Sequence, residues 1–147
     1  MIMDYRPSAE SDAGARTARR RIVSRMFASV AASVPVVRAW TRGTLQRLGV
    51  GTEVVERVEL LVTEVATNAV RHTSSPRFTV RLDVDADVDA DVHAAVHDDA
   101  PEEPQVRQAR TWDSGGRGMH LVEVMADAWG TRAERGGKWV WFRVGKT

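Results

Sequence analysis

The chain has 147 residues, of which 43% are hydrophobic and 28% charged, and its formal net charge is +1. This length and composition are typical of one soluble globular domain that buries about 70% of its unfolded surface. The lack of cysteine excludes disulfides, zinc–thiolate sites and cysteine nucleophiles,. No membrane span or signal peptide is recognisable, and the near-neutral charge argues against a general nucleic-acid binder, so a cytoplasmic protein is expected.

Residues 1–19 contain Pro7, Gly14 and two serines without any apolar periodicity, which predicts a disordered N-terminal arm,. The arm runs into a basic cluster formed by Arg19, Arg20, Arg21 and Arg25. Such a run is most often solvated, and contact with nucleic acid or an acidic partner is the alternative. We expect a single folded domain over residues 20–147.

The first elements of that domain are an edge strand over Ile22–Ser29 and a helix over Ser33–Leu48. Ser33 is the expected N-cap of the helix, and Pro35 falls in its first turn, where proline is tolerated. Gly49 and Gly51 end this helix,. Thr52 is expected to cap the next one.

A long helix is predicted from Thr52 to about Thr73, where apolar residues recur every three or four positions and form one buried stripe,. Glu64, Asn68 and His72 form a second stripe at four-residue spacing beside it,. Asn is a mediocre helix former, so its presence in a helix interior calls for a reason. A partly solvated helix edge without a special role remains the alternative.

Two strands of a hairpin are predicted next, over Phe78–Val84 and Val92–Val96, with the turn near Ala86–Asp89,. Aspartate occupies every second position from Asp83 to Asp91. An EF-hand loop needs glycine at its sixth position, and this stretch has none, so we interpret the acids as a solvated hairpin tip.

The segment from Ala100 to Gly116 has two prolines and no periodicity, which predicts an unusually long loop of the kind that forms lids,. A helical pattern containing Met119, Val122 and Met125 follows the glycine-rich turn at residues 115–118,. Two last strands are expected over Trp129–Ala133 and Trp139–Val144, joined at Gly136–Gly137.

Three separate features suit nucleotide chemistry, although each is weak alone. A glycine-rich turn that opens a helix offers backbone N–H groups to phosphate. Asp98 follows a buried strand and can accept a hydrogen bond from an exocyclic amine, or merely cap a turn,. Asn68 supplies a carbonyl oxygen suited to Mg²⁺, and Glu64 can orient or deprotonate a nucleophile.

Four motifs occur in an order that resembles the GHKL clan of ATPases, which includes gyrase, histidine kinases, a heat-shock chaperone and mismatch-repair proteins. TEVATNAVRH is similar to the N box of the clan, HDDAP to its first glycine box, GGRGMHLVEVMADAWG to its second, and GGKWVWF to its terminal strand. The match covers about residues 20–145. Within the clan, the chain resembles the small single-domain anti-sigma-factor kinases and their actinobacterial ATP-binding relatives. The resemblance implies an α+β fold of the Bergerat type, a two-layer α/β sandwich whose mixed, mostly antiparallel sheet carries about three helices on one face.

The resemblance also implies roles for individual residues. Glu64 would be the general base, Asn68 the magnesium ligand and Asp98 the adenine reader. The nucleotide-binding positions would further include Ala100, Gly116, Gly118 and Met119, with residues 100–115 as the lid. Within that lid Arg107 and Arg110 could reach phosphate, although a solvated role is the simpler interpretation, and His72 would support the helix end.

The chain departs from the clan pattern where Ala100 and Glu102 replace glycines and where Trp139 replaces a threonine that could help to hold adenine. The resemblance implies an ATP- and Mg²⁺-binding regulator that phosphorylates a serine of an antagonist protein. Its partners would be a sigma factor or an anti-anti-sigma-like antagonist, with no nucleic acid or membrane, and it would form a homodimer. The departures favour the alternative, a non-catalytic module that sequesters a partner.

Overall fold

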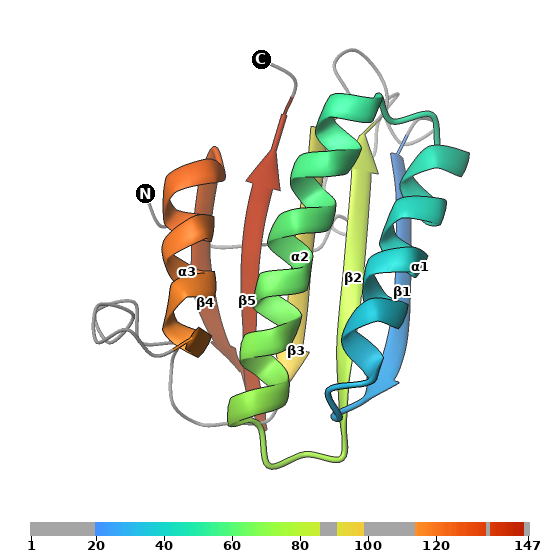
Figure 1. The fold of residues 1–147 in the computed structure, drawn as a ribbon. Coiled ribbons are helices and arrows are strands. Elements are labelled where there is room, and N and C mark those ends of the chain that lie inside the picture. Colours follow the sequence, from blue (N-terminus) through green and yellow to red (C-terminus); the bar gives the residue numbers. More distant parts are fainter. Residues whose placement is uncertain (1–19, 86–90, 99–113, 135, 146–147) are drawn as a thin grey trace.

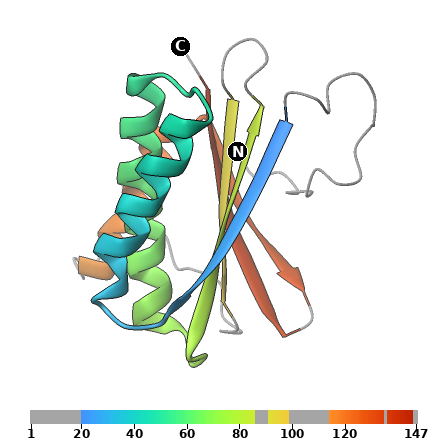
Figure 2. The ribbon, with the colours of Figure 1, turned by 90° about the vertical axis from the view of Figure 1, so that its right-hand side faces the viewer.

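The computed structural model describes residues 20–85, 91–98, 114–134 and 136–145. Helices lie on one face of a single sheet, so the chain forms two layers (Figure 1). The edge-on view in Figure 2 separates the two layers clearly. The elements, in chain order, are β1 (Arg20–Ala28), α1 (Ser33–Arg47), α2 (Thr52–His72), β2 (Arg77–Asp85), β3 (Asp91–Asp98), α3 (Ser114–Met125), β4 (Ala128–Glu134) and β5 (Gly137–Val144).

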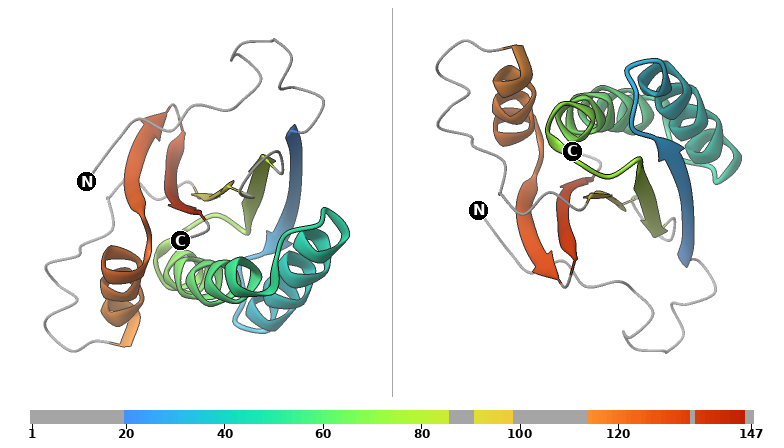
Figure 3. Two further views of the ribbon diagram at one scale, coloured as in Figure 1. Left: turned by 90° about the horizontal axis from the view of Figure 1, so that it is seen from above. Right: turned by 90° about the horizontal axis from the view of Figure 1, so that it is seen from below.

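The strands follow the order β1-β2-β3-β5-β4, and every pair of neighbours is antiparallel. β3 is therefore the central strand, and the views along the strands in Figure 3 show α2 lying over the middle of the sheet. This arrangement confirms the predicted α+β sandwich with three helices on one face. It also confirms that β1 is an edge strand. The sheet was expected to be mixed and mostly antiparallel, and its described strands are all antiparallel.

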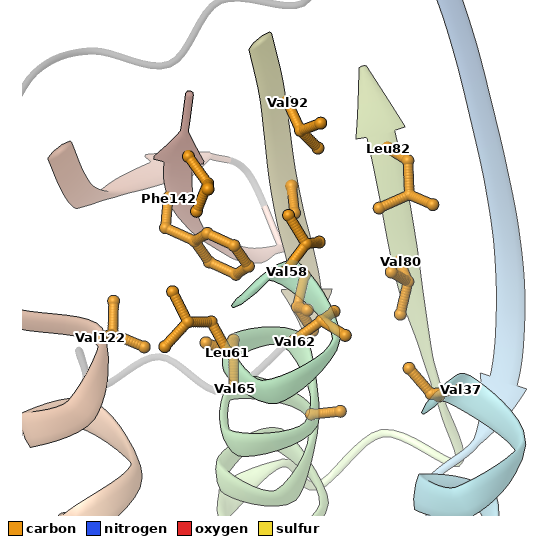
Figure 4. Close-up of a cluster of buried hydrophobic side chains, with 14 of the residues drawn as sticks. Val37, Val58, Leu61, Val62, Val65, Val80, Leu82, Val92, Val122 and Phe142 are labelled. Atoms are coloured by element: carbon orange, nitrogen blue, oxygen red, sulfur yellow. The ribbon is translucent and has the colours of Figure 1, made fainter. Parts of the chain in front are cut away.

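The core lies between α2 and the sheet, because alternate residues of the inner strands point towards the helix,. Val92, Ala94 and Val96 of β3 are buried in this way, and so are the matching residues of β5. Figure 4 shows Leu61 of α2 next to Val122 of α3 and Phe142 of β5. The apolar stripe that predicted α2 therefore holds the sheet and α3 together.

Polar contacts fix both flanking helices to α2. Arg42 of α1 donates from Nε to Glu59 of α2 at 3.0 Å. Arg57 of α2 donates to the backbone oxygens of Met125 and Gly145 at 3.0 and 3.1 Å. Met125 ends α3, and the last carbonyls of a helix have no partner within it, so Arg57 satisfies one of them.

Three local expectations were wrong. Ser33 and Thr52, the two expected N-caps, are instead the first helical residues of α1 and α2. The actual N-caps are Ala32 and Gly51, and neither has a side chain that accepts a hydrogen bond from the helix. Asp83 is not part of a solvated tip, because it lies within β2, is 2% exposed and accepts a bond from Arg20 at 3.1 Å.

The predicted arm over residues 1–19, the hairpin turn near residues 86–90 and most of the long loop lie outside the described residues. No helix among the residues that the structure describes is long and apolar enough to cross a membrane.

Candidate functional site

The polar stripe of α2 faces the neighbouring helix α3. Arg57, Leu61, Glu64 and Asn68 follow one another at spacings of four, three and four residues, so they share one edge of the helix,. The first two contact α3, through Met125 and Val122 respectively. Glu64 and Asn68 therefore lie on the edge of α2 that faces α3, one and two turns further along.

Asn68 is only 9% exposed and Glu64 is half-buried, whereas His72 is exposed at the end of the helix. The amide of Asn68 therefore lies at the boundary of the core. This burial disfavours the alternative of a merely solvated helix edge. His72 does not share the environment of the other two residues.

The beginning of α3 lies level with Asn68. Because Arg57 contacts Met125, the two helices run antiparallel from that point (Figure 1). Asn68 lies eleven residues beyond Arg57, or about 17 Å along α2, and Gly116 lies nine residues before Met125, or about 14 Å along α3. The N-terminal end of α3 thus lies beside the Glu64–Asn68 edge.

Helix α3 begins at Ser114, four residues before Gly118, so both predicted phosphate-binding glycines lie inside the helix. The first four N–H groups of a helix have no partner within it, and Gly116 contributes one of them, whereas Gly118 does not. Met119 is 1% exposed and belongs to the core. Ala100, Glu102, Arg107 and Arg110 lie outside the described residues.

Asp98 is the last residue of β3 and is 4% exposed. It continues the row of Val92, Ala94 and Val96, so its side chain points to the helix-covered face at the same end of the molecule as Asn68,. Lys138 is its partner across the β3–β5 ladder and donates from Nζ to Oδ1 of Asp98 at 3.1 Å.

Lys138 is the residue that sequence reasoning missed. The motif comparison singled out Trp139, but strand alternation places Trp139 on the opposite face of the sheet from Asp98,. There its indole N–H donates to Glu134 at 2.8 Å, and its ring lies 5.0 Å from that of His97. Identifying Lys138 requires the pairing register of β3 and β5, which cannot be read from the sequence.

The described residues thus place four kinds of group at one end of the molecule: a half-buried carboxylate, a buried amide, a helix N-terminus and a buried carboxylate–ammonium pair. Together they can accept hydrogen bonds from an amine, attract phosphate and donate an oxygen to a hard cation.

The chain matches the family model of the histidine kinase-like ATPase domain over residues 27–144. No curated protein matches it by sequence. Among solved structures it is similar to the RsbU and RsbW domains of Rv1364c from Mycobacterium tuberculosis, with a TM-score of 0.64 and 16% identity over 86% of this chain and 33% of that chain. It thus spans about a third of the length of the mycobacterial chain.

A further similarity is to the histidine kinase domain of a blue-light-activated histidine kinase from Erythrobacter litoralis EL346. The TM-score is 0.46 and the identity 22%, over 77% of this chain and 59% of that chain.

Proposed function

Because the chain belongs to the histidine kinase-like ATPase family, we propose that it binds ATP with Mg²⁺ and acts as a regulatory protein kinase of the anti-sigma-factor type. The acceptor would be a serine of an antagonist protein. The observation that carries this proposal is the placement of Glu64, Asn68, Asp98 and the start of α3 at one end of the two-layer fold.

The adenine, the phosphates and the cation of Mg²⁺-ATP each have a matching group there. The carboxylate of Asp98 suits the exocyclic amine of adenine, and the N-terminus of α3 suits the phosphates. The buried amide of Asn68 suits Mg²⁺, which is usually held by one or two protein oxygens together with phosphate oxygens,. When bound, the cation would neutralise charge on the phosphates.

Glu64 suits the role of general base, because a half-buried carboxylate beside the start of α3 lies near the expected phosphates,. The acceptor hydroxyl would lose its proton to Glu64 while its oxygen forms a bond to the γ-phosphorus. The bond from that phosphorus to the bridging oxygen would break, and ADP would leave. In phosphoryl transfer, positioning of the reactants and neutralisation of their charge supply most of the rate acceleration.

The same proposal covers partners and organisation. One of the similar solved structures contains a domain that its authors call RsbW. For this chain we propose a sigma factor or an anti-anti-sigma-like antagonist as partner, a homodimer as the assembly and the cytoplasm as its location. Residues 20–147 would form the ATP-binding domain and residues 1–19 an arm.

Calorimetry with ATP, in Mg²⁺ or in EDTA, tests the binding part. We expect Mg²⁺-dependent binding by the parent chain and loss of that dependence in Asn68→Ala. Thr67→Ala is the matched control, because the Thr67 hydroxyl is already bonded within α2, to the backbone oxygen of Thr63 at 2.7 Å. Unchanged affinity in Asn68→Ala would refute the metal assignment.

Transfer of labelled phosphate to candidate partners tests the kinase part. Glu64→Gln is expected to retain ATP binding and to lose transfer by about 10²–10⁴-fold, the usual contribution of a general base. If ATP binds and no partner is ever labelled, the chain is a sequestering module with nucleotide as a structural ligand. If no nucleotide binds, the whole proposal fails.

A further inference from the structure

The Asp98–Lys138 pair is a buried ion pair at the predicted base site. The side chains of Asp98 and Lys138 are 4% and 7% exposed, and Nζ lies 3.1 Å from Oδ1. The preceding core-facing residue of β3 is Val96 and the following one of β5 is Val140, both apolar and buried. The two charges therefore stand at the end of the apolar rows that β3 and β5 present beneath the helices.

Stability alone does not explain this pair. Removing two charges from water costs about as much as their attraction returns, so an apolar pair of similar volume would usually serve the core as well. The identity of the cation is also unusual, because only two of the 21 basic residues in the chain, Lys138 and Lys146, are lysines. Arginine is the common choice for buried ion pairs, whereas lysine supplies a compact point charge on a flexible stem.

The pair matches the edge of adenine. Adenine carries an exocyclic amine, which donates hydrogen bonds, directly beside ring nitrogen N1, which accepts one. A carboxylate next to an ammonium group offers the complementary acceptor and donor. We propose that Lys138 is a base-reading residue, with Nζ donating to N1 of adenine while Asp98 accepts from the exocyclic amine. This inference rests on the proposed function, since it requires ATP to bind here.

Two analogues of ATP separate the two contacts. In 1-deaza-ATP a C–H group replaces N1 and the amine is kept, whereas purine riboside triphosphate keeps N1 and lacks the amine. The parent chain should bind each analogue about ten- to a hundredfold more weakly than ATP, because each loses one hydrogen bond to a charged group.

The variant Lys138→Met isolates the role of Lys138. It should bind ATP and 1-deaza-ATP equally well, because the donor to N1 is gone, and it should still discriminate against purine riboside triphosphate through Asp98. Arg20→Met is the matched control. It removes the cation from another buried carboxylate, Asp83, on the face of the sheet away from the helices, and should leave all affinity ratios unchanged.

A measurement on the parent chain keeps the inference testable if Lys138→Met does not fold. Selective ¹³C-labelling of lysine yields signals from only two residues. ATP should shift the Lys138 Cε signal strongly, whereas 1-deaza-ATP should shift it much less.

Two results would overturn the inference while the proposed function stands: ATP binding with equal Lys138 shifts for both nucleotides, or an unchanged ATP to 1-deaza-ATP ratio in folded Lys138→Met. Failure of the parent chain to bind ATP at all would instead refute the proposed function and the inference with it.

Discussion

Replacing Leu61 with alanine tests the contact that aligns α2 with α3. Leu61 is fully buried and lies next to Val122 and Phe142. Losing three buried carbons costs about 2.4 kcal/mol of transfer free energy, and a cavity that collapses to about 50 Å³ adds roughly 1 kcal/mol. We therefore expect the free energy of unfolding to fall by about 3–4 kcal/mol, which corresponds to a melting temperature lower by about 6–16 °C.

Urea denaturation followed by tryptophan fluorescence measures this change, since the chain contains five tryptophans. Leu60→Ala is the matched control: Leu60 precedes Leu61 on the same helix but is 39% exposed, so its loss should cost under about 1 kcal/mol,. Because Leu61 shares its helix edge with Asn68, ATP affinity should also fall in Leu61→Ala and stay constant in Leu60→Ala. Equal stability losses in the two variants would refute the proposed packing of α3 on α2.

Three further predictions concern stability. Burial lowers the pKa of His93 from its ordinary value of 6.5, against the opposing effect of Asp91 and Asp83, so the unfolded chain binds the extra proton more readily,. The contribution of His93 to the free energy of unfolding is complete above about pH 6.5 and is lost as the pH falls. His93→Gln should therefore reduce the pH dependence of this free energy below about pH 6.5, and an unchanged pH dependence would contradict the prediction. Arg57→Met should lower the free energy of unfolding in urea by about 1–3 kcal/mol, because it removes the hydrogen bonds to the backbone oxygens of Met125 and of Gly145, which follows β5,. An unchanged free energy would contradict the role of this contact. Arg20→Met should cost a similar amount by the same assay, because it leaves the carboxylate of Asp83 buried without its arginine, and unchanged stability would show that water replaces the arginine,.

The order and type of the elements could be predicted from the sequence because periodicity reports which face of an element is buried. The spacing of Val54, Val58, Leu61 and Val65 predicted α2, and alternation from Phe78 to Val84 predicted β2,. Helix starts were less predictable, since Ser33 and Thr52 look like caps and yet are the first helical residues. Helix-terminal assignment depends on backbone angles that a side chain only biases.

The candidate site was predictable where it lies within one helix and unpredictable where it crosses strands. Glu64 and Asn68 are joined by helical spacing, which is fixed locally,. The partner of Asp98 depends on the β3–β5 register, and shifting that register by one residue exchanges Lys138 for Trp139,. The burial of Asp83 escaped prediction for a related reason, because its partner Arg20 lies 63 residues earlier in the chain.

The attachment of α3 by Arg57 has a mechanical consequence. The guanidinium holds α3 at Met125, the end of the helix remote from Gly116. Any tilt of α3 therefore pivots about this end. Over the lever arm of about 14 Å between these residues, a tilt of roughly 10° displaces Gly116 by about 2 Å. Small angular adjustments of one short helix therefore suffice to change its distance from Asn68 by more than half the length of a hydrogen bond.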